Sequence, residues 1–600
     1  MKKNIFFLVL LISGFVFAQK NPDNPQITSE EIKEHLQYLA SDEMKGRFSG
    51  SPEAYKAGEY IKEDFQRHGL KAAFAGNFFQ EFPFIEKVEL TKNNSLSLNV
   101  NGESEALKIN KDFTTAPFSG KQKINSDLVF TGYGISAPKL SYDDYEGIDV
   151  KGKVVLVMRY HPEHDSARSD FDRYSTFRYK ASVAKEKGAI GIIFVNGHVP
   201  KNDEDELMAL RYDGAAGIQD FSALQIKRDV VDRLFKSAGM NFAEVQNKID
   251  ASKKPDSFQF DNVNVSGETE TKEIERTARN VGGFLEGNDP VLKKEYIVIG
   301  AHYDHLGIDQ MLQASMYKGK DKQIHNGADD NASGTTGLLE IAEKIASVKD
   351  QLKRSIIFLA FSGEEEGILG STYYTNNPSV PLENIVAMLN MDMIGRLDSL
   401  KDLTVIGAGT SSKWKELLNE KNKYGFKLAL DESGTGGSDH QAFSIKDIPV
   451  LFFFTGMHSD YHKPSDDWEK INFTGEEDVC KYVDDIAMAI DQFEKRPDYV
   501  KVEAPSENRR ETRAKVSVGT VPEFGYNGSG YKISGVTDGG AAAKAGMKGG
   551  DVIVKFGPKT VNNIYDFMYA IGDYKAGDKV DVVVLRDGKE VTLKVELQAK

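Results

Sequence analysis

Short apolar runs alternate with stretches in which apolar residues recur every three or four positions. The runs cover residues 296–301, 355–361, 385–391, 403–407 and 450–454. Near-continuous apolar runs of this length are typical of strands covered on both faces. Residues 334–348 and 411–421, which lie between runs, have the spacing of amphipathic helices. We therefore predict an α/β unit with a mixed, mostly parallel sheet flanked by helices, closed by a helix over 475–493.

Two further helices are predicted near the start of the chain. Thr28 stands three residues before Glu31, the spacing of a capping box, and an apolar stripe follows it. Ser51 and Pro52 open the second helix, and Gly69 closes it. We assign residues 19–124 and 266–495 to one unit.

Between these two parts, residues 125–265 have a different pattern of apolar and polar positions. Short β-rich runs at 127–130, 154–158 and 190–195 surround a helical pattern at 177–187. This pattern predicts a self-contained β-rich insert. Residues 496–515 are polar and lack periodicity, which indicates a linker. The last residues, 516–600, alternate short strands and glycine turns around one helix at 541–546, which predicts a small α+β module.

The N-terminus predicts export. Lys2 and Lys3 precede an apolar run at residues 5–18, which ends in a plausible cleavage site before Gln19. The alternative, a membrane anchor, would need about 20 apolar residues. We expect residues 1–18 to be a signal peptide, no later segment to span a membrane, and the mature chain to be periplasmic or extracellular.

Charge and cysteine content narrow the chemistry. The 600-residue chain carries 76 Lys and Arg against 91 Asp and Glu, a formal net charge of −15, so nucleic acid is not an expected partner. Apolar residues make up 40% of the chain, which excludes wholesale disorder. Cys480 is the only cysteine, so any metal must be held by nitrogen and oxygen ligands.

Polar clusters follow the predicted strands of the α/β unit. The residues concerned are His302 and Asp304, Asp329 and Asp330, Glu364 to Glu366, Asp392, and Tyr461 with His462. Ligands bind beyond the carboxyl ends of strands in such sheets. Acids and imidazoles gathered on one rim would repel one another unless cations neutralised them.

This crowding indicates a metal site. Two imidazoles and three carboxylates suit two zinc-like ions that share one bridging carboxylate. A further free carboxylate must then move the proton of the attacking water, and the adjacent Glu364 and Glu365 provide one ligand and one free acid. The chain has no His-Glu-x-x-His helix and no Gly-x-Ser-x-Gly elbow, which disfavours helix-borne zinc proteases and serine hydrolases.

At these residues the sequence resembles the co-catalytic dizinc aminopeptidases of the M28 peptidase family. The resemblance covers roughly residues 27–120 and 265–495, and its fingerprints are 302–304, 327–334, 362–365, 390–395 and 461–462. It implies a zinc exopeptidase-like fold and two Zn²⁺ per chain. The implied ligands are Asp330 as the bridge, His302 and Asp392 for one ion, and Glu365 and His462 for the other.

The resemblance also implies three further roles. Glu364 would be the general base, Asp304 would orient His302, and Tyr461 would place its hydroxyl on the developing oxyanion. Asp329 is the competing candidate for the bridge because it neighbours Asp330.

Several other histidines are not among the implied metal ligands. Residues 434–443 resemble the loop that shapes the substrate pocket in this family, with His440 as either a pocket residue or a structural hydrogen-bonding group. His305 and His325 flank the metal loops, and we expect them to support ligands or to face solvent. His161 and His164 lie in a polar loop of the insert, which we expect to be solvated rather than a third metal site.

The two remaining units also resemble known domains. The insert at 125–265 resembles a protease-associated (PA) domain, which in related peptidases restricts access to the active site. The module at 516–600 resembles a PDZ domain, in which residues 528–533 would receive a peptide C-terminus or a partner protein by strand addition.

Together these patterns predict an exported metallo-exopeptidase that acts on peptide substrates, most simply an aminopeptidase. A carboxypeptidase on the same scaffold would need a basic clamp, for which Arg396 is a candidate. A glutaminyl cyclase would use one zinc, which the complete ligand set disfavours. A non-enzymatic binding protein would be expected to lack ligands that this chain retains.

Overall fold

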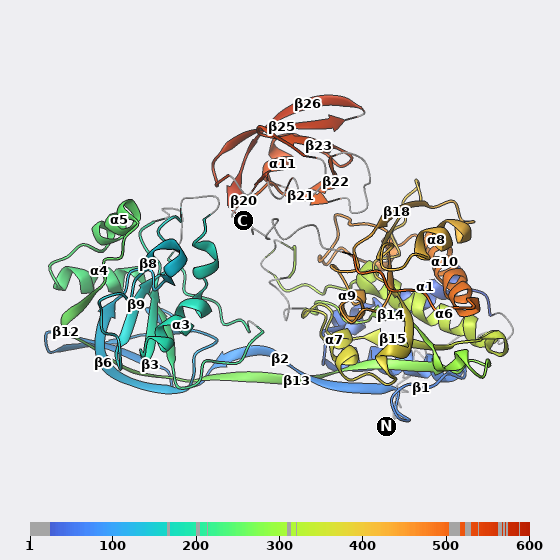
Figure 1. Cartoon of the computed structure of the whole chain (residues 1–600), viewed down its shortest axis with the longest axis horizontal. Coiled ribbons are helices and arrows are strands. Elements are labelled where there is room, and N and C mark those ends of the chain that lie inside the picture. The colour runs from blue at the N-terminus through green and yellow to red at the C-terminus, as the bar shows by residue number, and fades with distance from the viewer. Residues whose placement is uncertain are drawn as a thin grey trace, which may run out of the picture.

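The computed structural model describes most of the 600-residue chain. The described residues are 25–164, 169–199, 205–212, 214–308, 314–317, 319, 321–502, 516–522, 530–537, 539–561, 567, 570, 571, 574–586 and 588–599. The expected signal peptide at 1–18 lies outside them, as do residues 503–515 of the expected linker and Gly528 and Ser529 of the expected peptide-binding turn. Figure 1 shows three bodies, each with its own sheet.

The first body is built on a mixed nine-stranded sheet. Its strands are β1 (Lys71–Ala72), β2 (Phe79–Leu90), β13 (Thr271–Leu285), β14 (Tyr296–His302), β15 (Ser355–Phe361), β16 (Ile385–Met391), β17 (Asp402–Ile406), β18 (Lys427–Asp431) and β19 (Val450–Phe454). They follow the order β1-β13-β15-β14-β16-β19-β17-β18, and β2 pairs with β13. The four central strands, β15, β14, β16 and β19, run parallel, so their carboxyl ends share one edge.

Helices cover both faces of this sheet. They are α1 (Ser29–Leu39), α2 (Pro52–Arg67), α6 (Gly334–Ser347), α7 (Leu369–Asn376), α8 (Trp414–Lys421), α9 (His440–Ser444) and α10 (Phe473–Gln492). Side chains alternate between faces along each strand. In β14, Ile297 and Ile299 join the core under α1, α2, α6, α8 and α10, whereas Val298 joins the core under α7 and α9. This two-sided burial explains the continuous apolar runs in the sequence.

The predicted helix starts are confirmed. Thr28 caps α1 by accepting a hydrogen bond from the Glu31 backbone N–H at 3.3 Å. Ser51 caps α2 in the same way, through the Ala54 N–H at 3.0 Å. Both caps satisfy N–H groups that the first turn of a helix leaves without a partner.

The second body contains an eight-stranded sheet. Its strands are β3 (Ser95–Val100), β4 (Glu103–Leu107), β5 (Phe113–Thr115), β6 (Gln122–Phe130), β9 (Val154–Met158), β10 (Gly191–Val195), β11 (Ser222–Ile226) and β12 (Phe258–Thr269). Helices α3 (Phe177–Glu186), α4 (Arg228–Ser237) and α5 (Phe242–Ser252) pack on it, and β7 (Ser136–Ala137) pairs with β8 (Tyr142–Asp143). This sheet includes β3, β4 and β5, which precede the range 125–265 expected for the insert.

Two long strands join the first and second bodies. β2 and β13 pair antiparallel from Thr271 opposite Leu90 to Val281 opposite Phe79. Figure 1 shows this ribbon running along the bottom of the molecule from one body to the other. The insert therefore leaves the first sheet and returns to it on two strands that are paired with each other.

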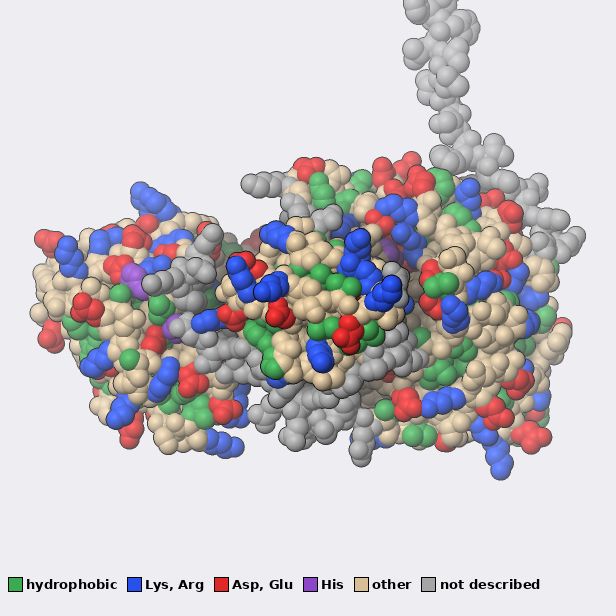
Figure 2. All heavy atoms as spheres, turned by 90° about the horizontal axis from the view of Figure 1, so that it is seen from above, with side chains coloured by type: hydrophobic (Ala, Val, Ile, Leu, Met, Phe, Trp, Pro, Cys, Tyr) green, Lys and Arg blue, Asp and Glu red, His purple; other side chains and the backbone are tan. Residues whose placement is uncertain are grey.

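The third body is the C-terminal module. Strands β21 (Thr520–Pro522), β22 (Tyr531–Val536), β23 (Val552–Phe556), β24 (Lys559–Thr560), β25 (Lys579–Arg586) and β26 (Lys589–Glu596) form one sheet, with helix α11 (Ala541–Lys544). β20 (Val516–Ser517) pairs with β27 (Gln598–Ala599). The face in Figure 2 mixes acidic and basic side chains. Among the described residues, no helix combines the length and the apolar character needed to cross a bilayer.

Candidate metal centre

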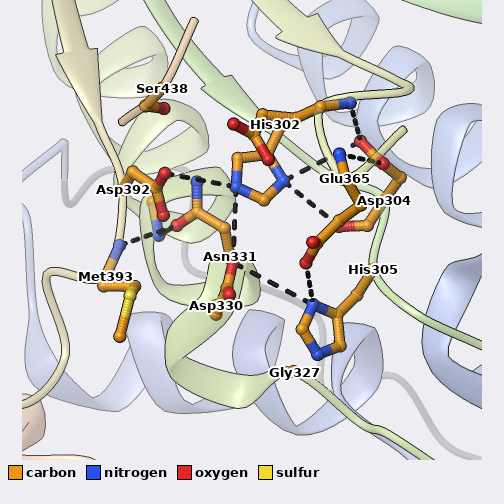
Figure 3. Close-up of polar contacts among 12 residues, drawn as sticks. His302, Asp304, His305, Gly327, Asp330, Asn331, Glu365, Asp392, Met393 and Ser438 are labelled. Atoms are coloured by element: carbon orange, nitrogen blue, oxygen red, sulfur yellow. Dashed lines mark hydrogen bonds and ion pairs between the residues drawn. The ribbon is translucent and has the colours of Figure 1, made fainter. Parts of the chain in front are cut away.

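The predicted site residues meet at the carboxyl edge of the parallel strands. His302 is the last residue of β14, Glu364 and Glu365 follow β15, and Asp392 follows β16. Asp330 lies in the turn η5 (Ala328–Ser333), which leads into α6. The parallel register of β14 with β15 and β16 brings these strand ends side by side, as Figure 3 shows.

Asp330 lies between the two predicted histidine ligands. Its Oδ1 is 3.4 Å from His302 Nε2, and its Oδ2 is 3.2 Å from His462 Nε2. The two oxygens of one carboxylate thus face two different imidazoles. Asp330 is 4% exposed, so its negative charge depends on these neighbours for compensation.

One further acid stands beside each imidazole. Asp392 Oδ2 lies 3.4 Å from His302 Nε2, and Glu365 Oε2 lies 3.2 Å from His462 Nε2. Tetrahedral zinc with ligands at about 2.0–2.1 Å keeps its ligand atoms about 3.3–3.4 Å apart. The separations at Asp330, His302 and Asp392 match that edge length, and those at His462 are slightly shorter.

The buried polar atoms also fit a cation. Among the described residues, His302 Nε2, Glu365 Oε1 and Asp392 Oδ1 are buried without a hydrogen-bond partner. Buried polar atoms without partners are rare in native proteins unless water or an ion satisfies them. Because imidazole nitrogens and carboxylate oxygens are ordinary zinc ligands, the residues present fit such an ion.

His305, expected either to support the ligands or to face solvent, belongs to this centre. The ring is fully buried, and its Nδ1 lies 2.6 Å from Glu365 Oε1. The two atoms form a close ion pair, and they lie nearer to each other than two ligands on one ion would. His305 therefore orients Glu365, in keeping with the expected supporting role. Its position three residues after His302 was the available signal.

Asp304 contacts the site differently from its expected role. The nearest acceptor to His302 Nδ1 is the Asp304 backbone carbonyl at 3.2 Å, and the Asp304 carboxylate is 3.8 Å away. That carboxylate instead accepts the backbone N–H groups of Glu364 at 3.3 Å and Glu365 at 3.4 Å. Asp304 thus holds both the imidazole and the loop that carries the glutamates.

Asp329, the competing candidate for the bridge, has both carboxylate oxygens engaged by other groups. Its Oδ1 accepts the Gly395 N–H at 2.7 Å, and its Oδ2 lies 3.0 Å from His458 Nε2. Asp466 fixes the turn between these acids, since its Oδ2 accepts the N–H groups of Asp329 and Asp330 at 3.0 and 3.1 Å. The geometry favours Asp330 over Asp329 as the shared carboxylate.

Charges within the site shift the pKa values strongly. Burial alone would raise the pKa of Asp330, but the histidines around it hold that pKa well below its usual range. Burial would lower the pKa of the imidazoles, but the neighbouring carboxylates raise the pKa of His302 well above its usual value and that of His462 to about 11. Without a metal ion, protons shared between acids and imidazoles take over the neutralising role.

Glu364 makes no ligand-like contact. It is partly exposed, and the structure gives its side-chain oxygens no hydrogen bond within the described chain. Burial raises its pKa well above the usual value, and the negative charges of Glu365, Asp439 and Asp392 raise it further. A carboxyl group in these surroundings binds a proton readily, as proton transfer requires.

A loop before η5 supports His462. The Ala314 carbonyl lies 3.0 Å from His462 Nδ1, and the Met316 N–H donates to the His462 carbonyl at 2.8 Å. Ser315 Oγ in turn lies 2.7 Å from Nε2 of the buried His325. A backbone carbonyl on Nδ1 fixes the imidazole so that Nε2 faces the two acids.

An apolar cluster borders the centre. Buried Met393, Phe452 and Phe454 pack with the half-buried Tyr461, whose ring stacks on His462 with centroids 3.8 Å apart. His440 stacks on Phe452, and its two ring nitrogens have no hydrogen-bond partner in the described part of the chain. Burial lowers the pKa of His440 to about 3, so the ring is neutral. The structure therefore supports packing rather than hydrogen bonding for His440.

The insert histidines do not share an acceptor. His161 Nε2 lies 2.9 Å from Asp172, and His164 Nε2 lies 3.0 Å from Asp250. Among the described residues, the groups suited to hold a metal ion are confined to the centre around Asp330. His161 is 1% exposed and the His164 side chain 5%, so the expectation that these two histidines are solvated is wrong: both rings are buried against the insert and paired with acids.

The architecture defines an α/β unit with a histidine–carboxylate centre, a β-rich insert and a small β module. Residues 280–485 match the family model of peptidase family M28, residues 124–234 that of the PA domain, and residues 508–597 that of the PDZ domain. The three matches confirm the resemblances found in the sequence and their order along the chain.

Individual relatives match over part of their length. Residues of this chain are 28% identical to aminopeptidase YwaD of Bacillus subtilis over 33% of the chain and 41% of the relative. They are 26% identical to leucine aminopeptidase 2 of Arthroderma otae over 62% of each chain. The chain spans less than half the length of the first relatives it matches. An aminopeptidase structure from Aneurinibacillus sp. strain AM-1 aligns with a TM-score of 0.46 and 21% identity, covering 80% of this chain and 97% of the other.

Proposed function

We propose that this protein is a zinc-dependent aminopeptidase that removes N-terminal residues from peptides. One observation carries the proposal: the two oxygens of Asp330 face His302 and His462, each beside a further acid. Two zinc ions would be held by His302 with Asp392 and by His462 with Glu365, with Asp330 shared. Bound zinc supplies Lewis-acid polarisation of a carbonyl and a water of lowered pKa.

The remaining chemistry falls to side chains of this chain. Glu364 would accept the proton of the attacking water and return it to the departing amine. Tyr461 would donate its hydroxyl to the oxygen on which negative charge develops. Burial and the nearby acids raise the pKa of Tyr461 well above its usual value, so the hydroxyl keeps its proton.

The surroundings favour an N-terminal substrate end. Arg396, the candidate clamp for a C-terminal carboxylate, is already paired with Asp460 at 2.9 Å. The apolar cluster of Met393, Phe452 and Phe454 offers an apolar side chain a place beside the centre. Relatives named leucine aminopeptidase agree with this preference.

Three further assignments belong to the same proposal. Residues 1–18 direct export, as their charged start and apolar run suggest. In this proposal the C-terminal module spans residues 516–600, and the insert begins at β3, before the start at residue 125 that the sequence suggested. The module binds a peptide segment or a partner protein, for which the PDZ match over residues 508–597 is the support.

Glu364→Gln tests the central role. We expect kcat on leucine amide to fall about 10²–10⁴-fold, because the amide cannot carry the proton. Two zinc ions per chain should remain, measured by elemental analysis. Glu366→Gln is the matched control, since Glu366 belongs to the same acidic run but accepts a hydrogen bond from Ser49 at 2.9 Å instead.

Substrate polarity is tested separately. Wild-type protein should hydrolyse leucine amide, reject N-acetyl-leucine amide, and lose activity with a zinc chelator. Full activity of Glu364→Gln would refute the assignment of the base. Cleavage of the acetylated substrate at an equal rate would refute the aminopeptidase.

A further inference from the structure

Arg47 ties together the two loops that carry the candidate ligands. It ends the turn η1 (Asp42–Arg47), and its side chain is fully buried. Nε donates to the Tyr303 carbonyl at 2.8 Å, Nη1 to the Asn326 carbonyl at 2.7 Å, and Nη2 to the Gly327 carbonyl at 3.0 Å. Nη1 also donates to the carbonyl of Leu39.

The carbonyls that Arg47 binds lie next to ligands. Tyr303 directly follows His302, and Asn326 and Gly327 directly precede η5, which carries Asp330. One planar guanidinium, with donors in a rigid fork, therefore sets the separation between the β14 loop and the η5 turn. The separation of His302 from Asp330 depends on that same distance.

The backbone of η1 makes a second, independent contact with these loops. The Gly307 N–H donates to the Gly46 carbonyl at 3.1 Å. A Cβ at Gly46 would lie 2.4 Å from the His325 carbonyl oxygen and 2.8 Å from that of Gly307. Gly46 also has a φ of +70°, a conformation that favours glycine. The turn is thus shaped for close approach to both loops.

The surroundings of Arg47 favour a positive charge on its side chain. The negative charges of Asp304, Asp330, Asp466 and Glu365 act on it and favour its charged form. Burial lowers the pKa of Arg47 to about 10, against the opposing effect of these acids, so the side chain stays cationic at neutral pH. A buried cation held by four carbonyls is costly to place and strongly directional.

We propose that Arg47 is a positioning residue that presets His302 and Asp330 for metal binding by fixing the two loops to η1. This inference rests on the proposed function, because it takes both residues as zinc ligands. It concerns geometry: Arg47 touches the backbone of the loops and not the reacting atoms.

Arg47→Lys is the test variant, because it keeps the charge but cannot reach four carbonyls from one point. Arg354→Lys is the matched control. Arg354 is also fully buried and donates to backbone carbonyls, at 3.1 Å to Ile490, 2.8 Å to Asp491 and 2.8 Å to Phe493, away from the centre. For each full-length protein we would measure thermal unfolding of the metal-free form, zinc affinity by chelator competition, and the absorption spectrum of the Co²⁺ form.

Both variants should lower the unfolding temperature of the metal-free protein. Only Arg47→Lys should weaken zinc binding, by about 10–100-fold as for other groups that orient ligands, and shift the Co²⁺ absorption bands. Zinc affinity within twofold of wild type with an unchanged spectrum would overturn the inference, as would equal weakening by Arg354→Lys. If wild-type protein bound neither ion, the proposed function would fail and the inference with it.

Asp42→Ala is a second test variant, to be used if Arg47→Lys does not fold. Asp42 is exposed, and its Oδ1 accepts from Asn326 Nδ2 at 2.9 Å, so it holds the same loop from the same turn. We expect a several-fold loss of zinc affinity with unfolding of the metal-free form almost unchanged. Glu43→Ala, at the neighbouring exposed position, is its control, and equal affinities for the two variants would count against the inference.

Discussion

Two adjacent aspartates of η5 have opposite surroundings. Asp330 faces His302 and His462, whereas Asp329 faces the Gly395 N–H and His458. Asp330→Asn should remove one shared charge from both metal positions, so zinc content should fall from two ions to fewer than one. Asp329→Asn should keep its zinc and lose about 1–3 kcal/mol of stability, because a buried charged hydrogen-bond acceptor is weakened.

Elemental analysis after dialysis and chemical denaturation would measure both effects. Each variant is the control for the other, since the two substitutions have the same chemistry and neighbouring positions. Retention of two ions by Asp330→Asn, or loss of both by Asp329→Asn, would exchange the roles of the two residues.

Protons and metal ions compete for the same imidazoles. The acids of the centre raise the pKa of His302 well above its usual value and that of His462 to about 11, so both rings carry protons at neutral pH without a metal. Ligation requires neutral imidazole. Zinc affinity should therefore rise with pH above 6.5, and binding of two ions should release about two protons. Calorimetry in buffers of different ionisation enthalpy measures the release, and His462→Gln should reduce it by about one.

The raised histidine pKa values also make the stability of the metal-free protein depend on pH. A raised histidine pKa stabilises the fold fully below the unfolded value of about 6.5 and loses that contribution as pH rises through the folded value. For His462 the loss extends toward pH 11. Metal-free protein should accordingly melt at a lower temperature at pH 9.5 than at pH 6.5. A rise in melting temperature over this window would contradict the pairing of His462 with its acids.

At the scale of elements, the loop before η5 acts on a single ligand. Ser315 holds His325, and its neighbours Ala314 and Met316 hold His462 through the backbone. Ser315→Ala should weaken one of the two zinc ions by about tenfold and leave the other unchanged, because the contacts reach only His462. Stepwise chelator titration separates the two ions. Ser347→Ala, in the last turn of α6, is a distant control, and equal weakening of both ions would argue against a local effect.

The sequence predicted some elements far better than others. The strands β9, β15, β16 and β19 have the predicted bounds, because burial on both faces leaves an unbroken apolar run. β4 is exposed along most of its length, and β2 contains Pro83, so neither carries such a run. Pairing with distant partners creates these strands, and no local pattern records that pairing.

The residues of the metal centre also divide into those that the sequence could predict and those that it could not. Side chains that follow strands, such as His302 and Asp392, could be predicted, since parallel strands end at one edge. His305 and Asp466 act through loops whose paths depend on the whole fold. Arg47 was beyond prediction for another reason: all its partners are backbone carbonyls, which every residue provides.

At the scale of the whole molecule, the bodies differ in how they are connected. The insert is bound to the first body by the paired strands β2 and β13, and β13 also pairs with β15 of the first sheet. The C-terminal module has its own core, and in the described chain its strands pair only with one another. Residues up to 502 pack on the first body, for example through the Val500 N–H, which donates to the Thr410 carbonyl at 2.8 Å.

A chain that ends at Val502 should therefore keep both other bodies intact. We expect its kcat/KM for leucine amide to stay within about twofold of the full chain, and its melting temperature to change little, because no core residue of the first body is removed. Cleavage of longer peptides is the matched comparison, since a peptide-binding module acts only on substrates long enough to reach it. A selective loss with long peptides would assign the module a part in substrate capture. Equal loss with leucine amide would instead mean that the module supports the metal centre itself, contrary to the separation of the cores.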